Sequence, residues 1–183
     1  YPFHDTYYNP SFWTGIPVNE SSSNDERIKD AMTRSSNYAI SQFESVKDYI
    51  KNLGVNKPIH IGETGWASIS SDNYGQNGTR AADEYKQYLY YSKIIDYGKK
   101  NNISIFYFSA FDEPWKDFNN PNGSENHFGL FTVDGRAKYA MWKNLDKGLL
   151  NGLGRNGLEV SKTYRGKRKN MMIDVLTPNK KNK

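Results

Sequence analysis

The chain has 183 residues, with 25 Lys and Arg against 20 Asp and Glu, no Cys, and hydrophobic residues making up 36% of the total. This length accommodates one domain with a sizeable core, and no apolar stretch approaches the roughly 20 residues that a membrane-spanning helix needs. The absence of cysteine excludes a disulfide framework and a thiolate metal site.

The first part of the chain predicts the end of a strand, a long loop and a helix. Tyr1-Pro2-Phe3 has the composition of a strand end, and residues 4–24 are rich in Tyr, Asn, Pro, Ser and Gly. Apolar residues at helical spacing from Ile28 to Leu53 predict a helix that ends at Gly54. Because the presumed strand end has no strand before it, we expect the chain to be a fragment of a longer protein.

Two further strand–loop–helix units follow. Pro58–Glu63 predicts a short buried strand, residues 68–78 a turn-rich loop, and Thr79 the cap of a helix that extends to about Lys100. The buried face of this helix is predicted to consist of Ala82, Tyr85, Leu89, Ser92 and Ile95. Ile103–Phe108 then predicts a strand, residues 111–130 a long loop, and residues 137–149 a shorter helix.

The last part of the chain is basic. Residues 155–183 hold 9 Lys or Arg and 2 Asp or Glu, whereas residues 1–154 hold 16 and 18. Residues 158–161 alternate like a strand. A nucleic-acid-binding function would depend on this tail alone, and a solvated terminal face is the simpler interpretation. We therefore expect no nucleic-acid partner and no membrane span.

The repeated order of strand and helix predicts a parallel sheet in an α/β fold. Long loops follow the strands and short links follow the helices, which is typical of a (β/α)8 TIM barrel with its site at the carboxyl ends of the strands. No glycine-rich phosphate loop supports a doubly wound sheet. Since a complete barrel needs roughly 250 residues, we expect an incomplete C-terminal portion with about three βα units in residues 1–150, followed by a basic C-terminal extension over residues 151–183.

Acidic and aromatic residues gather at the predicted strand ends. Glu63 ends one strand, and the next strand is followed by the segments 112–116 and 125–131. Carboxyl groups on both sides of a scissile bond are what glycoside hydrolysis requires. Lys116 would keep a neighbouring carboxylate charged, and Trp66, Trp115 and Phe128 would stack on glucose rings. A surface ion pair and ordinary packing are the simpler interpretations of these residues. The pattern indicates no metal ion and no cofactor.

Three motifs together resemble glycoside hydrolase family 17, the β-1,3-glucanases. Ile61-Gly62-Glu63-Thr64-Gly65-Trp66 is similar to the nucleophile motif of the family. Phe111-Asp112-Glu113-Pro114-Trp115-Lys116, followed by Glu125-Asn126-His127-Phe128-Gly129-Leu130-Phe131, resembles its last-strand signature. Tyr1-Pro2-Phe3 resembles the aromatic end of its sixth strand. The matches lie in the family's order over residues 1–147. The sequence of residues 111–116 and the absence of cysteine favour a bacterial parent.

The resemblance implies a retaining double displacement on laminarin-like β-1,3-glucan, with Glu63 as the nucleophile. The residues that would line the cleft and bind the substrate are Tyr1, Trp66, Glu113, Trp115, Lys116, Glu125 and Phe128. The family's general acid follows an earlier strand and has no counterpart in this chain, so we expect the chain by itself to be inactive. The implied location is secreted, periplasmic or on the cell surface.

Two other functions stay open on the sequence. A β-1,3-glucan transglycosylase would form the same covalent intermediate and pass it to a sugar instead of water. A non-catalytic carbohydrate-binding module would use the aromatic residues, which make up 15% of the chain, but it has no need of carboxylates at strand ends. The oligomeric state is undetermined.

Overall fold

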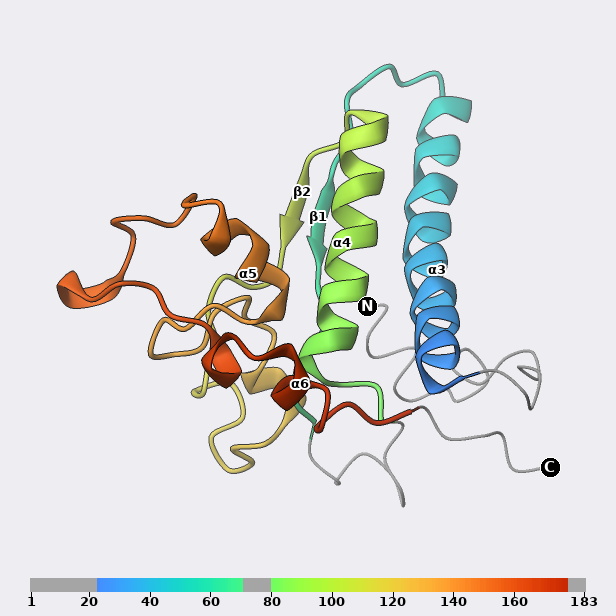
Figure 1. Ribbon diagram of the computed structural model, residues 1–183. Coiled ribbons are helices and arrows are strands. Elements are labelled where there is room, and N and C mark those ends of the chain that lie inside the picture. Colours follow the sequence, from blue (N-terminus) through green and yellow to red (C-terminus); the bar gives the residue numbers. More distant parts are fainter. Residues whose placement is uncertain (1–22, 71–79, 178–183) are drawn as a thin grey trace.

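The computed structural model describes residues 23–70 and 80–177, which form an α/β arrangement (Figure 1). Helices α3 (Asn24–Asn52) and α4 (Glu84–Asn101) lie side by side and run in the same direction, and the strands β1 (Ile61–Thr64) and β2 (Ile105–Tyr107) run in the opposite direction. The predicted strand end at Tyr1–Phe3 and the predicted cap at Thr79 lie outside the described residues.

The two strands form the parallel pair that the repeated order predicts. Ile61 lies opposite Ile105 and Thr64 lies opposite Tyr107, with an irregularity between the two positions. Both strands are shorter than predicted. The expectation that the first is buried is wrong for most of its length, because Gly62 and Glu63 are exposed and only Thr64 is buried. Among the described residues, helices cover one face of this pair and leave the other open.

Helix α3 begins and ends close to the predicted positions. Ser23 caps it through a reciprocal pair of hydrogen bonds with Glu26, which satisfies two backbone N–H groups of the first turn. The chain leaves the helix at Gly54, whose φ of 73° lies in the left-handed region that glycine adopts without strain. The start of the helix is buried through Ile28, Ala31 and Met32.

The second half of α3 keeps its apolar face uncovered. Val46 is 55% exposed and Leu53 is 61% exposed, although both share the predicted apolar stripe with the buried first turns. Together with Ile59, which precedes β1, and Ile61, which begins it, this part of α3 lines a groove of about 590 Å³. The apolar stripe therefore extends farther than the surface that the described residues bury.

Helix α4 begins later than predicted. Arg80 has a φ of 56°, which no α-helix includes, and the cap is Asp83, whose side chain accepts a hydrogen bond from the Lys86 backbone N–H. The helix ends at Asn102 in the left-handed conformation, and the backbone N–H of Asn102 donates to the carbonyl of Gly98.

The predicted buried face of α4 is fully buried only at Tyr85, while Ala82 and Leu89 are partly buried against the core. The face that packs on the strands instead contains Tyr90, Ile94 and Gly98, all buried. A Cβ atom on Gly98 would lie 2.9 Å from the backbone carbonyl oxygen of Ile103 and 2.5 Å from Cδ1 of Ile105, and because the backbone oxygen cannot move away, only glycine permits this approach of the helix to the start of β2. Leu89 faces α3 across a second groove. Hydropathy gives little weight to tyrosine and glycine, which explains the error.

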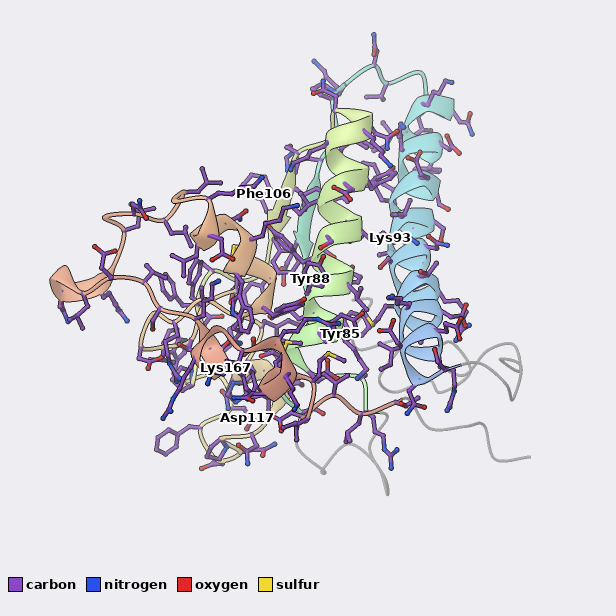
Figure 2. All side chains as sticks on the ribbon, in the orientation of Figure 1. Tyr85, Tyr88, Lys93, Phe106, Asp117 and Lys167 are labelled. Atoms are coloured by element: carbon purple, nitrogen blue, oxygen red, sulfur yellow. The ribbon has the colours of Figure 1, made fainter. Side chains whose placement is uncertain are left out.

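The core includes residues from the end of the chain. The main cluster of buried side chains joins α3, the segment after β1, α4 and the 3-10-flanked helix α6 (Arg168–Met171), and consists of Ile28, Ala31, Met32, Trp66, Ala67, Ala81, Tyr85, Tyr90, Ile94, Phe128 and Met171. In Figure 2, Tyr85 and Tyr88 lie where the first turns of α4 meet these C-terminal segments. Met171 is 1% exposed, whereas Lys167, Arg168 and Lys169 are exposed. The basic side chains are thus solvated while the segment that carries them packs inward.

The remaining elements are short. Helix α5 spans Tyr139–Asp146, inside the predicted range, and the 3-10 turns are η1 (Ser124–Asn126), η2 (Arg155–Gly157) and η3 (Thr163–Gly166). The predicted strand at 158–161 is wrong, because these four residues belong to no strand, and an isolated parallel bridge to Ala137 follows them at Lys162. No helix in the described part of the chain is long and apolar enough to cross a membrane.

Candidate active site

Glu63 is exposed at the carboxyl end of β1. Its neighbour Thr64 faces α4, where its hydroxyl lies 2.6 Å from the hydroxyl of the buried Tyr90. On β2, Tyr107 likewise packs against Tyr91 of α4, while Phe106 is 60% exposed (Figure 2). Because successive side chains of a strand point to opposite faces, Glu63 lies on the open face of the sheet. It also lines the groove beside β1.

Backbone hydrogen bonds join the segments that follow the two strands. The N–H of Phe108 donates to the carbonyl of Thr64 at 2.7 Å, and the N–H of Ser68 donates to the carbonyl of His127 at 3.0 Å. The N–H of Asp112 donates to the carbonyl of Phe131 at 2.9 Å. The predicted loop after β2 therefore folds back on itself and against the end of β1, so both carboxylate-bearing segments lie at the same end of the sheet.

Buried Asn126 gives this loop a fixed shape. Its side-chain carbonyl accepts a hydrogen bond from the Asp117 N–H at 2.8 Å, and its amide donates to the carbonyls of Asp117 and Asn120, both at 2.9 Å. Its backbone carbonyl accepts from the N–H of Glu113 at 3.0 Å. A buried amide that satisfies three backbone groups holds the loop rigidly.

Gly129 allows the closest contact within the loop. A Cβ atom at this position would lie 2.2 Å from the backbone nitrogen of Asp112 and 2.5 Å from the carbonyl oxygen of Phe131. Backbone atoms cannot move away as a flexible side chain can. The glycine of the Phe-Gly-Leu-Phe sequence is therefore required by packing.

Three of the predicted cleft residues lie on this loop beside one another in the chain. The ammonium of Lys116 lies 3.3 Å from Oε2 of Glu113 and 4.0 Å above the ring of Phe108. Trp115, between them, is 67% exposed. Glu125 is half-buried in η1. An ion pair over an aromatic ring and an open indole form a surface that a sugar chain could contact.

Two predicted stacking residues lie in the core. Trp66 is 0% exposed, its indole N–H donates to the carbonyl of Ala81 at 2.9 Å, and its ring packs on Tyr90. Phe128 is 2% exposed and packs on Phe108. The predicted role of these two rings in stacking on glucose finds no support in the structure, because neither offers an open face. The predicted cleft residue Tyr1 lies outside the described residues.

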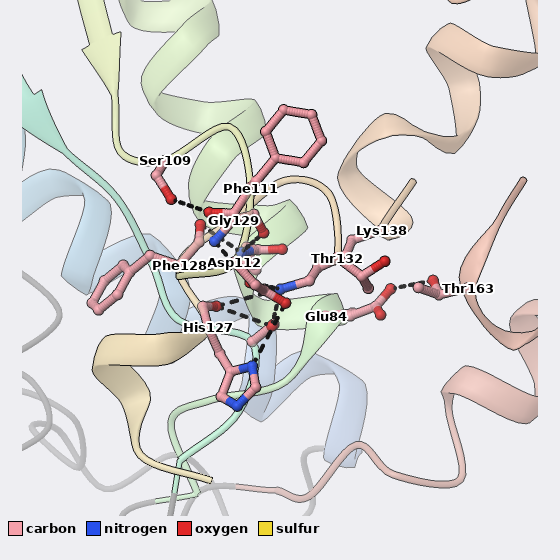
Figure 3. A network of polar contacts seen from close by, with 12 residues as sticks. Glu84, Ser109, Phe111, Asp112, His127, Phe128, Gly129, Thr132, Lys138 and Thr163 are labelled. Atoms are coloured by element: carbon pink, nitrogen blue, oxygen red, sulfur yellow. Dashed lines mark hydrogen bonds and ion pairs between the residues drawn. The ribbon is translucent and has the colours of Figure 1, made fainter. Parts of the chain in front are cut away.

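A buried network of charges lies beneath the loop (Figure 3). The ammonium of Lys138, just before α5, lies 2.6 Å from Oδ1 of Asp112 and 2.6 Å from Oγ of Ser68, and it donates to the carbonyl of His127 at 3.4 Å. Oδ1 of Asp112 also accepts from the N–H of Gly129 at 3.1 Å. Burial lowers the pKa of Lys138, and the carboxylate of Asp112 opposes this shift.

Glu84 continues this network toward the C-terminal segment. Its carboxylate accepts from the backbone N–H of Tyr139 and from the hydroxyl of Thr163, both at 2.8 Å (the latter bond is drawn in Figure 3). Burial raises the pKa of this carboxyl group above its ordinary value of 4.5, and the two hydrogen bonds oppose the shift. Glu84 therefore ties α4 to α5 and η3, although burial disfavours its charged form.

We expect the raised pKa of Glu84 to make the stability of the chain depend on pH. Glu84 binds its proton more tightly in the folded than in the unfolded chain, so its favourable contribution is complete below the unfolded value of about 4.5 and is lost as the pH rises through the raised folded pKa. Urea midpoints of the wild type and Glu84→Gln between pH 4 and 8 measure this. The variant should lose less stability over that range, and parallel profiles would contradict the assignment.

The sequence did not single out this network. Asp112 belongs to a motif that resembles the family but carries no predicted role, and no motif in the sequence marks Lys138, Ser68 or Glu84 as a site residue. A single lysine between Ala137 and Tyr139 in an otherwise apolar segment is a signal of an unusual environment. Its partner, however, lies 26 residues away, and no local pattern connects the two.

Comparisons with known proteins place the chain in a class. Residues 29–142 match the model of Glycosyl hydrolases family 17. The chain is 36% identical over 88 residues to a glucan 1,3-beta-glucosidase of Arthroderma benhamiae, and 33% identical over 99 residues to the acidic isoform PR-O of a glucan endo-1,3-beta-glucosidase of Nicotiana tabacum. These matches cover 44% and 48% of this chain, and 27% and 54% of the relatives.

A solved structure is similar over the whole chain. The endo-laminarinase from Formosa Hel1_33_131 superposes with a TM-score of 0.91 at 52% sequence identity, over 100% of this chain and 47% of that protein. These similarities place the chain among the glycoside hydrolase families. The chain belongs to glycosyl hydrolases family 17, as the three motifs predict. It spans about half the length of the solved relative and less than a third of the Arthroderma protein.

Proposed function

We propose that this chain is the C-terminal part of a (β/α)8 barrel that hydrolyses β-1,3-glucan of the laminarin type. The observation that carries the proposal is the exposed Glu63 at the end of β1, beside a rigid loop that presents Glu113 and Lys116 at the end of β2. The 52% identity to an endo-laminarinase over the whole chain supports the choice of substrate. The share of that protein which the chain covers, 47%, supports the expectation of a partial barrel.

The proposed reaction is a retaining double displacement. The carboxylate of Glu63 attacks the anomeric carbon and forms a covalent glycosyl ester while the glycosidic C–O bond breaks and the leaving oxygen takes a proton from a general acid. Water then attacks the same carbon, gives its proton to the conjugate base of that acid, and releases Glu63. No residue of this chain is assigned as the acid, so the chain by itself is expected to be inactive.

The surrounding residues have supporting roles in this proposal. Lys116 neutralises Glu113 at 3.3 Å, so the ion pair can accept and donate hydrogen bonds to sugar hydroxyls without a net charge. Glu125 lies on the same loop. The indole of Trp115 is 67% exposed and offers an apolar face to a glucose ring. Action on a polymer suits a protein that is secreted, periplasmic or on the cell surface.

The substrate is tested with the complete barrel, meaning residues 1–183 joined to the N-terminal barrel half of the same protein. We expect it to release short oligosaccharides from laminarin and little from a β-1,4- or β-1,6-glucan. Products longer than a defined laminari-oligosaccharide substrate would instead identify a transglycosylase. A complete barrel that binds laminarin but never cleaves it would be a carbohydrate-binding module, and both results would contradict the proposed hydrolysis.

A further inference from the structure

The ammonium group of Lys138 contacts three segments that carry candidate cleft residues in the described part of the chain. Ser68 lies on the segment that follows Glu63, Asp112 directly precedes Glu113, and His127 follows Glu125 by two residues. These segments come from the ends of two different strands and from the far side of the loop. Figure 3 shows the ammonium pointing to Asp112 and His127 from the start of α5.

The contacts use every hydrogen-bond donor that Lys138 has. An ammonium group has three N–H bonds, and Lys138 has three acceptors, at 2.6, 2.6 and 3.4 Å. The Ser68 hydroxyl can accept this bond because its own proton is donated to the carbonyl of His127 at 3.1 Å. Since the Lys138 side chain is 2% exposed and that of Asp112 is 7% exposed, water cannot replace a lost contact without opening the structure.

Asp112 transmits this arrangement to the loop. Its Oδ1 bonds both Lys138 and the N–H of Gly129, and its Oδ2 lies 3.6 Å from Nδ1 of His127. Its backbone N–H is bonded to Phe131, and the next residue is Glu113. A shift of the Asp112 carboxylate would therefore move the backbone that orients Glu113.

We propose that Lys138 is a positioning residue that holds the Glu63 and Glu113 segments in register across the carboxyl ends of β1 and β2. This positioning role rests on the function proposed above, because the register of the two segments matters only if both act on one substrate. Lys138 does not touch the substrate. It acts through Ser68 and Asp112, and its loss misplaces the reacting groups.

The loss of any buried, paired lysine would lower stability, so the test needs a second such lysine that does not contact the cleft segments. Lys86 supplies this matched control. It too is a fully buried lysine paired with a buried aspartate, Asp83, near the start of a helix. Its ammonium also donates to the carbonyl of Leu176 at 2.7 Å, which lies in the C-terminal segment and not in the cleft loop. Both substitutions leave an uncompensated buried carboxylate, but only one of them affects the segments beside Glu63 and Glu113.

The test compares Lys138→Met, Lys138→Arg and Lys86→Met in the complete barrel. We expect Lys138→Met to lower kcat on laminari-oligosaccharides on the order of 10²-fold, the loss typical of misplaced reacting groups, with KM changed less than about threefold. Lys138→Arg, which keeps the charge and its donors, should recover part of the loss. Lys86→Met should reduce stability with kcat within about twofold of the wild type.

Amide hydrogen exchange gives a second readout that needs no activity. Lys138→Met should accelerate exchange over both 64–70 and 109–130, whereas Lys86→Met should accelerate it only over 80–86 and 171–177. If Lys138→Met does not fold, Lys138→Gln, which keeps donors to Ser68 and Asp112 without the charge, replaces it in both measurements.

The outcomes separate the two proposals. An active wild type whose Lys138→Met variant keeps kcat within threefold overturns the positioning role, and so does an equal loss of kcat in Lys86→Met. A wild-type barrel that does not cleave β-1,3-glucan overturns the proposed function. In that case, hydrogen exchange still tests whether Lys138 couples the two segments. Accelerated exchange confined to the neighbourhood of residue 138 in Lys138→Met would overturn the coupling, and accelerated exchange over both 64–70 and 109–130 would support it.

Discussion

Glu63→Gln in the complete barrel is expected to lower kcat for laminarin hydrolysis on the order of 10³-fold or more, as the removal of a nucleophile does in other hydrolases. The amide keeps the shape of the side chain but cannot form a glycosyl ester. Because Glu63 lies at the carboxyl end of β1, at the rim of the proposed barrel, and glutamine has nearly the same shape, the substitution should leave the urea midpoint close to that of the wild type. Initial rates and unfolding curves of the same preparation provide the measurement.

A control and a chemical rescue make this prediction specific. Glu159→Gln removes an equally exposed carboxylate from the C-terminal segment, and its rate should equal that of the wild type. In Glu63→Ala, added azide can take the place of the carboxylate and attack the anomeric carbon, giving a glycosyl azide of inverted configuration from an activated glycoside. An unchanged rate in Glu63→Gln, or the absence of the azide adduct, would reject the assignment of Glu63 as nucleophile.

Trp66→Ala is expected to lower the free energy of unfolding by about 3–5 kcal/mol, the usual cost of deleting a fully buried large aromatic side chain. The indole is 0% exposed, packs on Tyr90 and donates to the carbonyl of Ala81. The substitution therefore creates a cavity and leaves that carbonyl without its partner. The same replacement at Trp115, which is 67% exposed, should change stability by less than about 0.5 kcal/mol.

Affinity for glucan should respond in the opposite order. Trp115→Ala removes an open indole face beside the Glu113–Lys116 pair and should weaken binding of laminari-oligosaccharides several-fold, as a lost aromatic contact does. Urea unfolding and calorimetric titration of the two variants measure both properties. Equal stability losses would show that the two tryptophans have similar environments, and unchanged affinity in Trp115→Ala would remove Trp115 from the binding surface.

The sequence predicts the order and direction of the strands because these depend on patterns that are local. The end of α3 follows from Gly54, and the parallel pairing of β1 with β2 follows from the helix that connects them. The position of Glu63 at the carboxyl end of a strand belongs to the same kind of prediction, although its exposure does not. Each depends on residues close together in the chain.

The predictions that fail depend on contacts between distant residues. The buried face of α4 is set by how closely Gly98 meets Ile105, and a hydropathy pattern does not register a close approach. Trp66 is of a residue type that often stacks on sugars, yet this side chain is buried because α4 and the residues before α4 cover it. Lys138 is assigned to the candidate site only by its contacts with Ser68 and Asp112, 70 and 26 residues away.

The inward packing of the last turns has a consequence for where this unit can be cut. The match to the family model stops at residue 142, but Met171 completes the core between α3 and α4, and the carbonyl of Leu176 binds the buried ammonium of Lys86. A shortened polypeptide ending at residue 150 would leave a hole among apolar side chains and would remove one of the two acceptors of the buried Lys86 ammonium. The smallest piece able to hold its shape therefore reaches past the recognisable motifs to at least residue 176.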